Sequence, residues 1–414
     1  MGNNNRLEII KDINERLSSL RQEAIQIDVP KDEIACFYEQ RSDLLTDKTN
    51  TQILKLDSCL VETVSMKGLK NLLNPMLISI LSEHRQFLKE DLDTLIDSLK
   101  ALPIINYSVF GQISGFNIDK EILELGDFIV YRADSDELRS FIDPINSKIS
   151  TQCNGFKGLL TNCTTVRINV PSRDVTMAII KAYKYFRSFD FVTAFVINDI
   201  SSNYNYGIFT YKPPSLNTCI AIGENKSWEL NSNVVNSPIT LVISEHEGQQ
   251  LETFSDIWLL ITKINKNKIE SRILNSIEWI GKAIFEPDIS KAFVMYMFSI
   301  ESLLQYDEDT MINPSIIHQL SESLAFLLGI KYKDRINIVN CVKALYRKRS
   351  AIVHGGDTRI GQNDIIQINK IAISAVWAFL SNPELKELKN MSDFNTWLSI
   401  KKFTEPSLIE EETN

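Results

Sequence analysis

Residues 345–356 read LYRKRSAIVHGG and end a segment with the periodicity of a helix. In and before this stretch, apolar residues recur every three or four positions, at Ile338, Val342, Leu345 and Ile352. This spacing is typical of the buried face of a helix, and Arg349 lies on the same face. Because an unpaired charge among apolar side chains is costly, Arg349 needs a carboxylate, an anionic ligand or a second subunit as its partner.

His354 is five residues after Arg349, which places it about 140° around the helix axis from Arg349 and about 7.5 Å further along the axis. Two glycines come next and end the helix, as glycine just past a helix commonly does. Carbonyls exposed at a helix C-terminus favour a protonated imidazole, which suits a general acid or base near neutral pH. In the simpler interpretation, His354 only caps these carbonyls. Arg349 then forms a structural ion pair with Glu301, the lone charge of Ala292–Leu304.

The chain after residue 246 contains only helical patterns. Helices are predicted at about 251–264, 269–285, 288–306, 316–330, 334–353 and 364–381. The third of these is apolar nearly all round, so we expect it to be central. Residues 247–382 are therefore predicted to form an all-α bundle, and residues 383–414 a polar, peripheral C-terminal tail.

The chain before residue 246 mixes helical and strand patterns. Helices are predicted at 5–24, 31–43, 52–100 and, with Ser172 as a candidate N-cap, 172–187. Strands are predicted at 107–113, 127–133, 165–170, 191–198, 205–211 and 241–244, with short strands and loops over 201–237. We expect residues 1–246 to be a mixed α/β region, with a break near 104–150 if it holds two subdomains. The predicted fold class of the whole chain is α+β.

The net charge of −9 argues against a general nucleic-acid coat. The charge is not evenly distributed, because Lys331–Arg349 contains seven Lys or Arg residues and one acid, Asp334. This stretch is either a solvated helix face or a phosphate-binding patch.

Composition also excludes several classes of protein. The densest apolar stretch, Ala292–Leu304, is too short to span a bilayer, and the N-terminus lacks the apolar run of a signal peptide. None of the six cysteines forms a CxxC pair, and with only four histidines the chain shows no spacing of the kind that binds zinc. We expect a cytoplasmic protein with reduced, mostly buried cysteines, no structural metal and no cofactor.

Residues 250–382 resemble a HEPN domain of the Apea-like branch, which is linked to abortive phage infection. The hallmark of the family is Arg, a polar residue, three variable residues and His, and it stands here as Arg349, Ser350 and His354. Three upstream segments are similar to helices of the family: SIEWIGKAIF at 276–285, AFVMYMFSIESLLQY at 292–306 and LSESLAFLLG at 320–329. The resemblance covers about a third of the chain and implies that this part is a HEPN bundle.

The resemblance implies a metal-independent endoribonuclease of anti-phage defence. Two motifs would meet across a helical interface, so that a homodimer or higher oligomer forms a composite site. Arg349 would stabilise the charged phosphate, His354 would move the proton and Ser350 would position a group or a water. Glu301 either joins this site as an auxiliary residue or only pairs with Arg349.

The same resemblance suggests partners for the other residues. RNA, with tRNA as one candidate, would be the substrate, and its candidate contacts are Lys343, Arg347 and Lys348. Residues 1–246 would be a sensor or regulatory region that responds to a phage-derived trigger. Two alternatives stay open: a non-catalytic HEPN module that binds RNA, a nucleotide or a protein partner, and a structural bundle in which Arg349 is only ion-paired.

Overall fold

The structure, a computed structural model, consists of two compact units. Unit 1 comprises Met1–Phe110, Arg167–Lys184 and Thr218–Ser232, and unit 2 comprises Gly111–Val166, Tyr185–Asn217 and Asn233–Asn414. The residues that the structure describes are 2–30, 33–41, 44–152, 160, 162–198, 206–211, 214–216, 218–232, 241–286, 288–305, 316–355 and 359–403.

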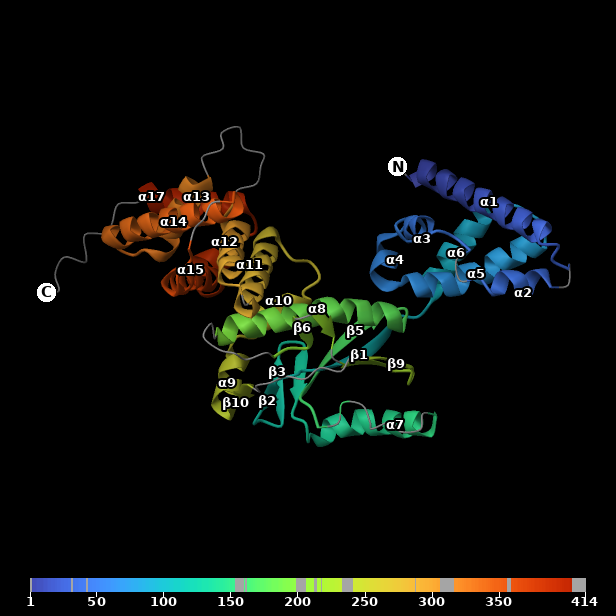
Figure 1. Cartoon of the computed structure of the whole chain (residues 1–414), viewed down its shortest axis with the longest axis horizontal. Coiled ribbons are helices and arrows are strands. Elements are labelled where there is room, and N and C mark those ends of the chain that lie inside the picture. The colour runs from blue at the N-terminus through green and yellow to red at the C-terminus, as the bar shows by residue number, and fades with distance from the viewer. Residues whose placement is uncertain are drawn as a thin grey trace. The chain divides into compact units, whose positions relative to one another are not determined.

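The N-terminal part of unit 1 is helical (Figure 1). Its helices are α1 (Gly2–Gln26), α2 (Ile34–Glu39), α3 (Asp47–Leu54), α4 (Ser58–Thr63), α5 (Met66–Ser82) and α6 (Lys89–Ala101). Their apolar faces meet in a core that includes Ile13, Leu20, Leu69, Leu77 and Leu99. The helix predicted over 52–100 is divided because two polar residues cap new helices. Asp57 accepts the Cys59 N–H at 2.8 Å, and Ser65 accepts the Gly68 N–H at 2.9 Å.

A six-stranded sheet has the strand order β3-β4-β5-β1-β8-β9. Its strands are β1 (Ile105–Gln112), β3 (Ile122–Leu125), β4 (Phe128–Tyr131), β5 (Thr165–Ser172), β8 (Thr218–Gly223) and β9 (Trp228–Ser232). β3 pairs antiparallel with β4, and β8 with β9. Two smaller sheets join β2 (Phe116–Ile118) to β10 (Leu241–Ile243) and β6 (Phe209–Tyr211) to β7 (Pro214–Leu216). The predicted α+β class is confirmed.

The helix that follows β5 begins later than the sequence predicted. Buried side chains alternate along β5 as expected, at Val166, Ile168 and Val170. The strand continues to Ser172, however, so Ser172 does not cap the next helix, α8 (Val175–Ile197). A carboxylate two residues further on has that role, because Asp174 Oδ1 accepts the Met177 N–H at 2.9 Å.

The predicted strand over 191–198 is wrong, because α8 continues to Ile197. A helix buried on several sides has the same uninterrupted apolar run as a buried strand, so the two patterns cannot be separated by periodicity. Phe189, Phe191 and Phe195 are all at most 3% exposed. The ring of Phe189 lies 5.4 Å from that of Trp258, and the ring of Phe195 lies 5.0 Å from that of Trp377. This half of α8 therefore belongs to the core of unit 2.

Helix α7 (Asp136–Gln152) was not predicted. Its buried residues have helical spacing, at Leu138, Ile142, Ile145 and Ile149. Pro144 lies inside the helix, and a proline within an apolar pattern normally indicates a break. The proline therefore hid a helical signal that the apolar residues carried.

The C-terminal part of unit 2 is helical (Figure 1), and from α10 to α15 the helices match the predicted ones closely. They are α9 (Glu245–Thr253), α10 (Ser255–Thr262), α11 (Lys268–Phe285), α12 (Ile289–Leu304), α13 (Ile316–Leu328), α14 (Tyr332–Val353) and α15 (Gln362–Ser381). The predicted helix 251–264 corresponds to α10 and the last three residues of α9, so most of α9 was not predicted, and the two helices meet at Phe254. α12 packs against α11, α13, α14 and α15, so it is central, as expected. The boundary predicted near residue 246 falls inside unit 2, next to the start of α9.

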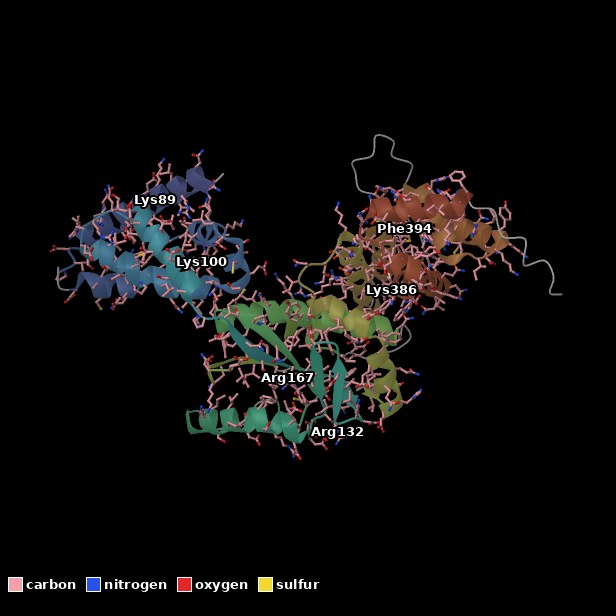
Figure 2. All side chains as sticks on the ribbon, turned by 180° about the vertical axis from the view of Figure 1, so that it is seen from behind. Lys89, Lys100, Arg132, Arg167, Lys386 and Phe394 are labelled. Atoms are coloured by element: carbon pink, nitrogen blue, oxygen red, sulfur yellow. The ribbon has the colours of Figure 1, made fainter. Side chains whose placement is uncertain are left out.

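The C-terminal tail is not peripheral over residues 383–403, which corrects the prediction. α16 (Pro383–Lys386) and α17 (Met391–Phe403) follow α15, and α17 packs against α13. Phe394, labelled in Figure 2, is fully buried, and its ring lies 5.4 Å from that of Phe379. Residues 404–414 lie outside the part of the chain that the structure describes.

The cysteines are less buried than expected. Cys219 is fully buried, and this burial raises the pKa of its thiol. Cys36 and Cys59 are exposed, whereas Cys163 and Cys341 are half-buried. Cys153 lies outside the described residues. The exposed pair contradicts the expectation that cysteines of this chain serve mostly as small buried apolar residues.

Helix α15 has the length and composition of a membrane-spanning helix, and it alone has both among the described residues. Its apolar side chains also form part of the core of unit 2, with Ile368, Ala372, Ala375, Val376 and Phe379 all buried. A core helix satisfies the same two criteria as a spanning one, and the packing of α15 accounts for its composition.

A buried carboxylate in α8 holds the segment before β6 in place. Asp190 is 1% exposed, and its oxygens accept the N–H groups of Ile208 at 2.9 Å and Phe209 at 3.0 Å. Gly207 beside it has a φ of +145°, and a Cβ built there would lie 2.9 Å from Asp190 Oδ2. The close approach of the carboxylate therefore requires glycine at position 207.

Asp190→Ala should lower the free energy of unfolding by about 3 kcal/mol, because it leaves two buried N–H groups without their acceptors. Asp190→Asn keeps one acceptor oxygen and should cost less than half as much. The midpoint of thermal unfolding, followed by circular dichroism, measures both. The control is Asp136→Ala, since the Asp136 side chain is 92% exposed. An Asp190→Ala protein as stable as this control would contradict the prediction.

Candidate functional site

Arg349 and Glu301 are joined, as the simpler interpretation of the sequence predicted. The Arg349 guanidinium on α14 donates through Nη2 to Glu301 Oε2 on α12 at 3.1 Å. The two side chains are 18% and 13% exposed, so the pair lies largely away from solvent. On α14, Val342 and Leu345 are buried, whereas Ile338 and Ile352 are half-buried. Arg349 thus lies on the covered face of the helix, where the apolar spacing put it.

The ion pair leaves bonding capacity on both partners. Arg349 Nε and Glu301 Oε1 are buried, and neither has a hydrogen-bond partner among the described residues. The guanidinium carbon lies 5.3 Å from the centre of the Phe298 ring and 5.6 Å from that of Tyr346. Aromatic faces attract a cation but accept no strong hydrogen bond in the plane of the fork. Arg349 therefore keeps donors that a second acceptor could use.

The pairing does not fully compensate the burial of Glu301. Burial raises the pKa of the Glu301 carboxyl above its ordinary value of 4.5, and the opposing effect of Arg349, through charge and a hydrogen bond, is smaller. The neighbouring Tyr346 is also partly buried, and its burial raises the pKa of its hydroxyl. The carboxylate is thus held in a partly desolvated place, and its charge costs stability there.

Glu301→Gln should change how stability depends on pH. A carboxyl whose pKa is raised on folding binds more protons in the folded state, so wild-type stability should fall as pH rises from 4.5 through the raised value. Gln cannot titrate, so the thermal midpoint of the variant should gain on that of the wild type over the same range. Thermal scans of both proteins at pH 4.5, 5.5, 6.5 and 7.5 test this. A constant difference between the two midpoints would contradict it.

His354 lies at the C-terminal end of α14 and is exposed. Its backbone N–H donates to the Ser350 carbonyl at 3.1 Å, and Gly355 follows with a φ of +78°, the left-handed conformation that ends the helix. Gly356 lies outside the described residues. The contacts found among the described residues do not join the His354 imidazole to Arg349 or Glu301. The structure therefore brings Arg349 and Glu301 together. His354 is close to Arg349 in the sequence, but its side chain is exposed on the surface.

The sequence of α14 contains a second stripe with helical spacing. This exposed stripe consists of residues spaced by four and three positions: Tyr332, Ile336 and Val353 are exposed, whereas Val339, Lys343, Tyr346 and Ser350 are half-buried. Tyr332 is 80% exposed, Ile336 is 42% exposed and Val353 is 49% exposed. At about 100° per residue, His354 falls on this stripe, and Arg349 lies about 100° from Ser350. The stripe is thus apolar over most of its length and ends at His354.

The basic residues of α14 fall into two groups. Arg347 is exposed and Lys343 is half-buried. Lys348 is engaged, because its Nζ donates to both oxygens of Asp364 at 2.7 Å. Although burial acts in the opposite direction, this bond helps to lower the pKa of Asp364. Arg335 donates to the Gly329 carbonyl at 3.0 Å. Lys343 and Arg347 are therefore the better placed of the predicted phosphate contacts.

The described residues include no group of three His, Cys, Asp or Glu side chains that could hold a metal ion. Comparison with known proteins returned no matching family model, no matching curated protein and no matching solved structure. The residues that bear on function are therefore Glu301 of α12 and the motif of Arg349, Ser350 and His354 at the end of α14.

Proposed function

We propose that the chain is a metal-independent endoribonuclease of the HEPN type, in the Apea-like branch, that acts in anti-phage defence in the cytoplasm. The observation that supports it most is Arg349, a largely buried guanidinium that, among the described residues, has one bond to Glu301 and a buried Nε without a partner. An RNA phosphate supplies acceptors for these donors, since the planar fork of arginine matches phosphate oxygens. His354 completes the motif at the end of the same helix.

The active species in this proposal is a dimer through the exposed stripe of α14. An isologous interface places equivalent residues opposite one another, so the stripe would be covered by its own copy. Its apolar members, Tyr332, Ile336 and Val353, would then lose their exposed surface. Two His354 imidazoles would approach each other near the two-fold axis, with an Arg349 beside each. The two Arg349 guanidiniums would be stable near one another when an anion, such as an RNA phosphate, lies between them.

The reaction needs no group beyond these side chains. In RNA the 2′-hydroxyl is held next to the phosphorus and serves as an internal nucleophile. A bond forms from the 2′-oxygen to phosphorus, and the bond from phosphorus to the 5′-oxygen breaks. One His354 of the dimer would accept the proton of the 2′-hydroxyl and the other would donate a proton to the leaving 5′-oxygen, while Arg349 stabilises the negative charge on the phosphate oxygens. Ser350, one turn before His354, would position a water or the substrate.

A second candidate function is a non-catalytic HEPN module that binds RNA, a nucleotide or a protein partner. The bond between Arg349 and Glu301 favours it, because a guanidinium already paired has less need of a substrate phosphate. The enzyme is preferred because a module kept only for binding has no chemical need for both Arg349 and His354. Residues 1–246 would be the sensor or regulatory region under either function, responding to a phage-derived trigger.

Replacing Lys343 and Arg347 by Ala together should weaken RNA binding and reduce its salt dependence. Each phosphate contact to single-stranded RNA contributes about 0.7 to the slope of log affinity against log salt, so the slope should fall by about 1.4. Fluorescence anisotropy at several salt concentrations measures this. The control is Lys370→Ala with Lys389→Ala, which removes the same charge from exposed positions outside α14. Equal slopes for the two double variants would contradict the assignment of Lys343 and Arg347.

The proposal is tested by expressing the wild type and His354→Ala in cells and sequencing the ends of their RNA. New ends that are present with the wild type and absent with the variant, at equal protein levels, are the expected result. Such ends also identify the substrate. If His354→Ala produces the same ends as the wild type, the proposed site does not cut RNA.

A further inference from the structure

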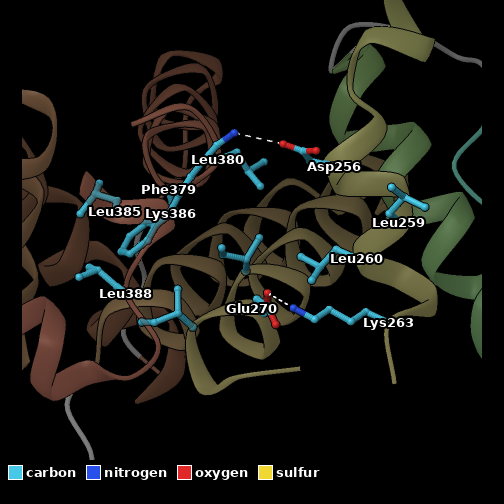
Figure 3. Close-up of a pocket in the computed structure, with 12 residues that line it drawn as sticks. Asp256, Leu259, Leu260, Lys263, Glu270, Phe379, Leu380, Leu385, Lys386 and Leu388 are labelled. Atoms are coloured by element: carbon cyan, nitrogen blue, oxygen red, sulfur yellow. Dashed lines mark hydrogen bonds and ion pairs between the residues drawn. The ribbon is translucent and has the colours of Figure 1, made fainter. Parts of the chain in front are cut away.

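A second site in unit 2 lies away from Arg349, in a groove between α10, α11, α15 and α16 with a volume of about 380 Å³ (Figure 3). Its floor is apolar and covered: Leu260, Ile269, Ile273, Phe379 and Leu385 are each at most 8% exposed. Leu259, at the rim, is 46% exposed. A volume of this size is within the range of small-molecule sites in proteins.

Two ion pairs border the groove, and apolar side chains lie between them (Figure 3). Lys386 Nζ lies 3.1 Å from Asp256 Oδ2, and Lys263 Nζ lies 2.5 Å from Glu270 Oε1. Apolar lining with a few charged groups at the edge is the usual composition of a site for an amphipathic molecule. The charged groups would then decide which head group is accepted.

The two ion pairs differ in how easily a ligand could replace one partner. Glu270 is 22% exposed on its side chain, and it also accepts the Asn267 N–H at 2.9 Å in the capping box that begins α11. The side chains of Asp256 and Lys386 are 75% and 45% exposed, and within the part of the chain that the structure describes their ion pair is with each other. An exposed pair of this kind contributes little to stability and can be exchanged. Lys386 and Asp256 are therefore the groups that a ligand would meet.

The sign of the head group follows from what each partner keeps after exchange. Asp256 lies in the first turn of α10, where the helix N-terminus favours a negative charge. Released from Lys386, Asp256 therefore retains a favourable environment. Lys386 lies at the end of the four-residue helix α16. So short a helix stabilises the charge of Lys386 less than α10 stabilises the charge of Asp256. Lys386 therefore gains more from a new anionic partner.

We propose that this groove binds an anionic amphiphile of the fatty-acid class. The acyl chain would lie on the floor formed by Leu260, Ile273 and Phe379, and the carboxylate would accept a hydrogen bond from Lys386 Nζ in place of Asp256. The site is separate from Arg349 and His354, so the proposal does not depend on ribonuclease activity.

Calorimetric titration of the full chain with decanoate, kept below the concentration at which it aggregates, tests the proposal. We expect saturable binding of one decanoate per chain. Decanol, which has the same chain without the charge, should bind about tenfold more weakly, a difference of about 1.4 kcal/mol. The absence of saturable decanoate binding would overturn the proposal, and equal affinity for decanol would overturn the role of the carboxylate.

Variants locate the binding in the groove. Leu388→Trp fills the groove and should weaken decanoate binding at least tenfold. If this variant fails to fold, Leu259→Trp replaces an exposed lining residue and should have the same effect. Lys386→Ala should weaken decanoate about tenfold and leave decanol unchanged. The matched control Lys389→Ala, an exposed lysine outside the lining, should change neither.

Two further results would overturn the proposal. One is wild-type decanoate affinity in a folded groove-filling variant. The other is a change of oligomeric state in Leu388→Trp or Leu259→Trp, seen by sedimentation, together with no decanoate binding to the wild type. That combination would show that the groove is covered by another protein chain.

Discussion

His354→Ala is expected to lower the rate of RNA cleavage about 10³-fold, since general acid–base catalysis contributes a factor of this size. The imidazole is exposed at the end of α14, and the bond that this residue makes to Ser350 comes from its backbone N–H. Its removal should therefore leave the fold and the thermal midpoint unchanged. The measurement is the rate of cleavage of a labelled RNA by the purified wild type and variant.

A matched histidine provides the control for this experiment. His318 on α13 has a side chain that is 62% exposed, and it lies 3.9 Å from Glu322. His318→Ala should keep the wild-type rate. A folded His354→Ala protein with the rate of His318→Ala would remove His354 from the mechanism.

Ile336→Asp is expected to convert the dimer to a monomer and to lower cleavage about 100-fold. Ile336 lies in the exposed stripe of α14, so in an isologous dimer the substitution places two uncompensated carboxylates in one interface. A loss of 100-fold corresponds to about 2.7 kcal/mol, which is modest for two such charges. Sedimentation velocity measures the oligomeric state, and the RNA cleavage assay measures activity.

Ile264→Asp is the control for the dimer experiment, because Ile264 is 89% exposed and lies outside α14. It adds the same charge and should leave both assembly and cleavage unchanged. If Ile336→Asp stays dimeric and active, the exposed stripe of α14 is not the interface. If the wild type is a monomer and cleaves RNA, the composite site is wrong.

The helices from α10 to α15 could be predicted well because two local signals agree there. Apolar residues recur at helical spacing along α11, and Asn267 and Glu270 form a capping box at its start. The second half of α8 could not be predicted, since Phe191–Ile197 is apolar except for Thr193 and shows no helical period. The polar composition of residues 383–414 predicted a peripheral tail, but three of the apolar residues of α17, Met391, Phe394 and Leu398, are buried and hold the helix against the rest of unit 2.

The candidate site was predictable in part. Arg349 and Glu301 were each a lone charge on an apolar helix face, and two such charges are expected to find one another. The unpaired atoms of the two side chains depend on how the helices are offset, which no spacing reveals. The exposed stripe has the same period as the buried one on α14. Periodicity alone therefore could not tell which of the two faces is covered within the chain.

The measurement that tests the central claim most directly is the chemical identity of the RNA ends produced by purified protein in the presence of EDTA. Attack by the 2′-hydroxyl predicts a 2′,3′-cyclic phosphate on one product and a 5′-hydroxyl on the other, with neither product formed by His354→Ala. Products with 3′-hydroxyl and 5′-phosphate ends, or cleavage that stops in EDTA and returns with Mg²⁺, would contradict a metal-independent site built on Arg349 and His354.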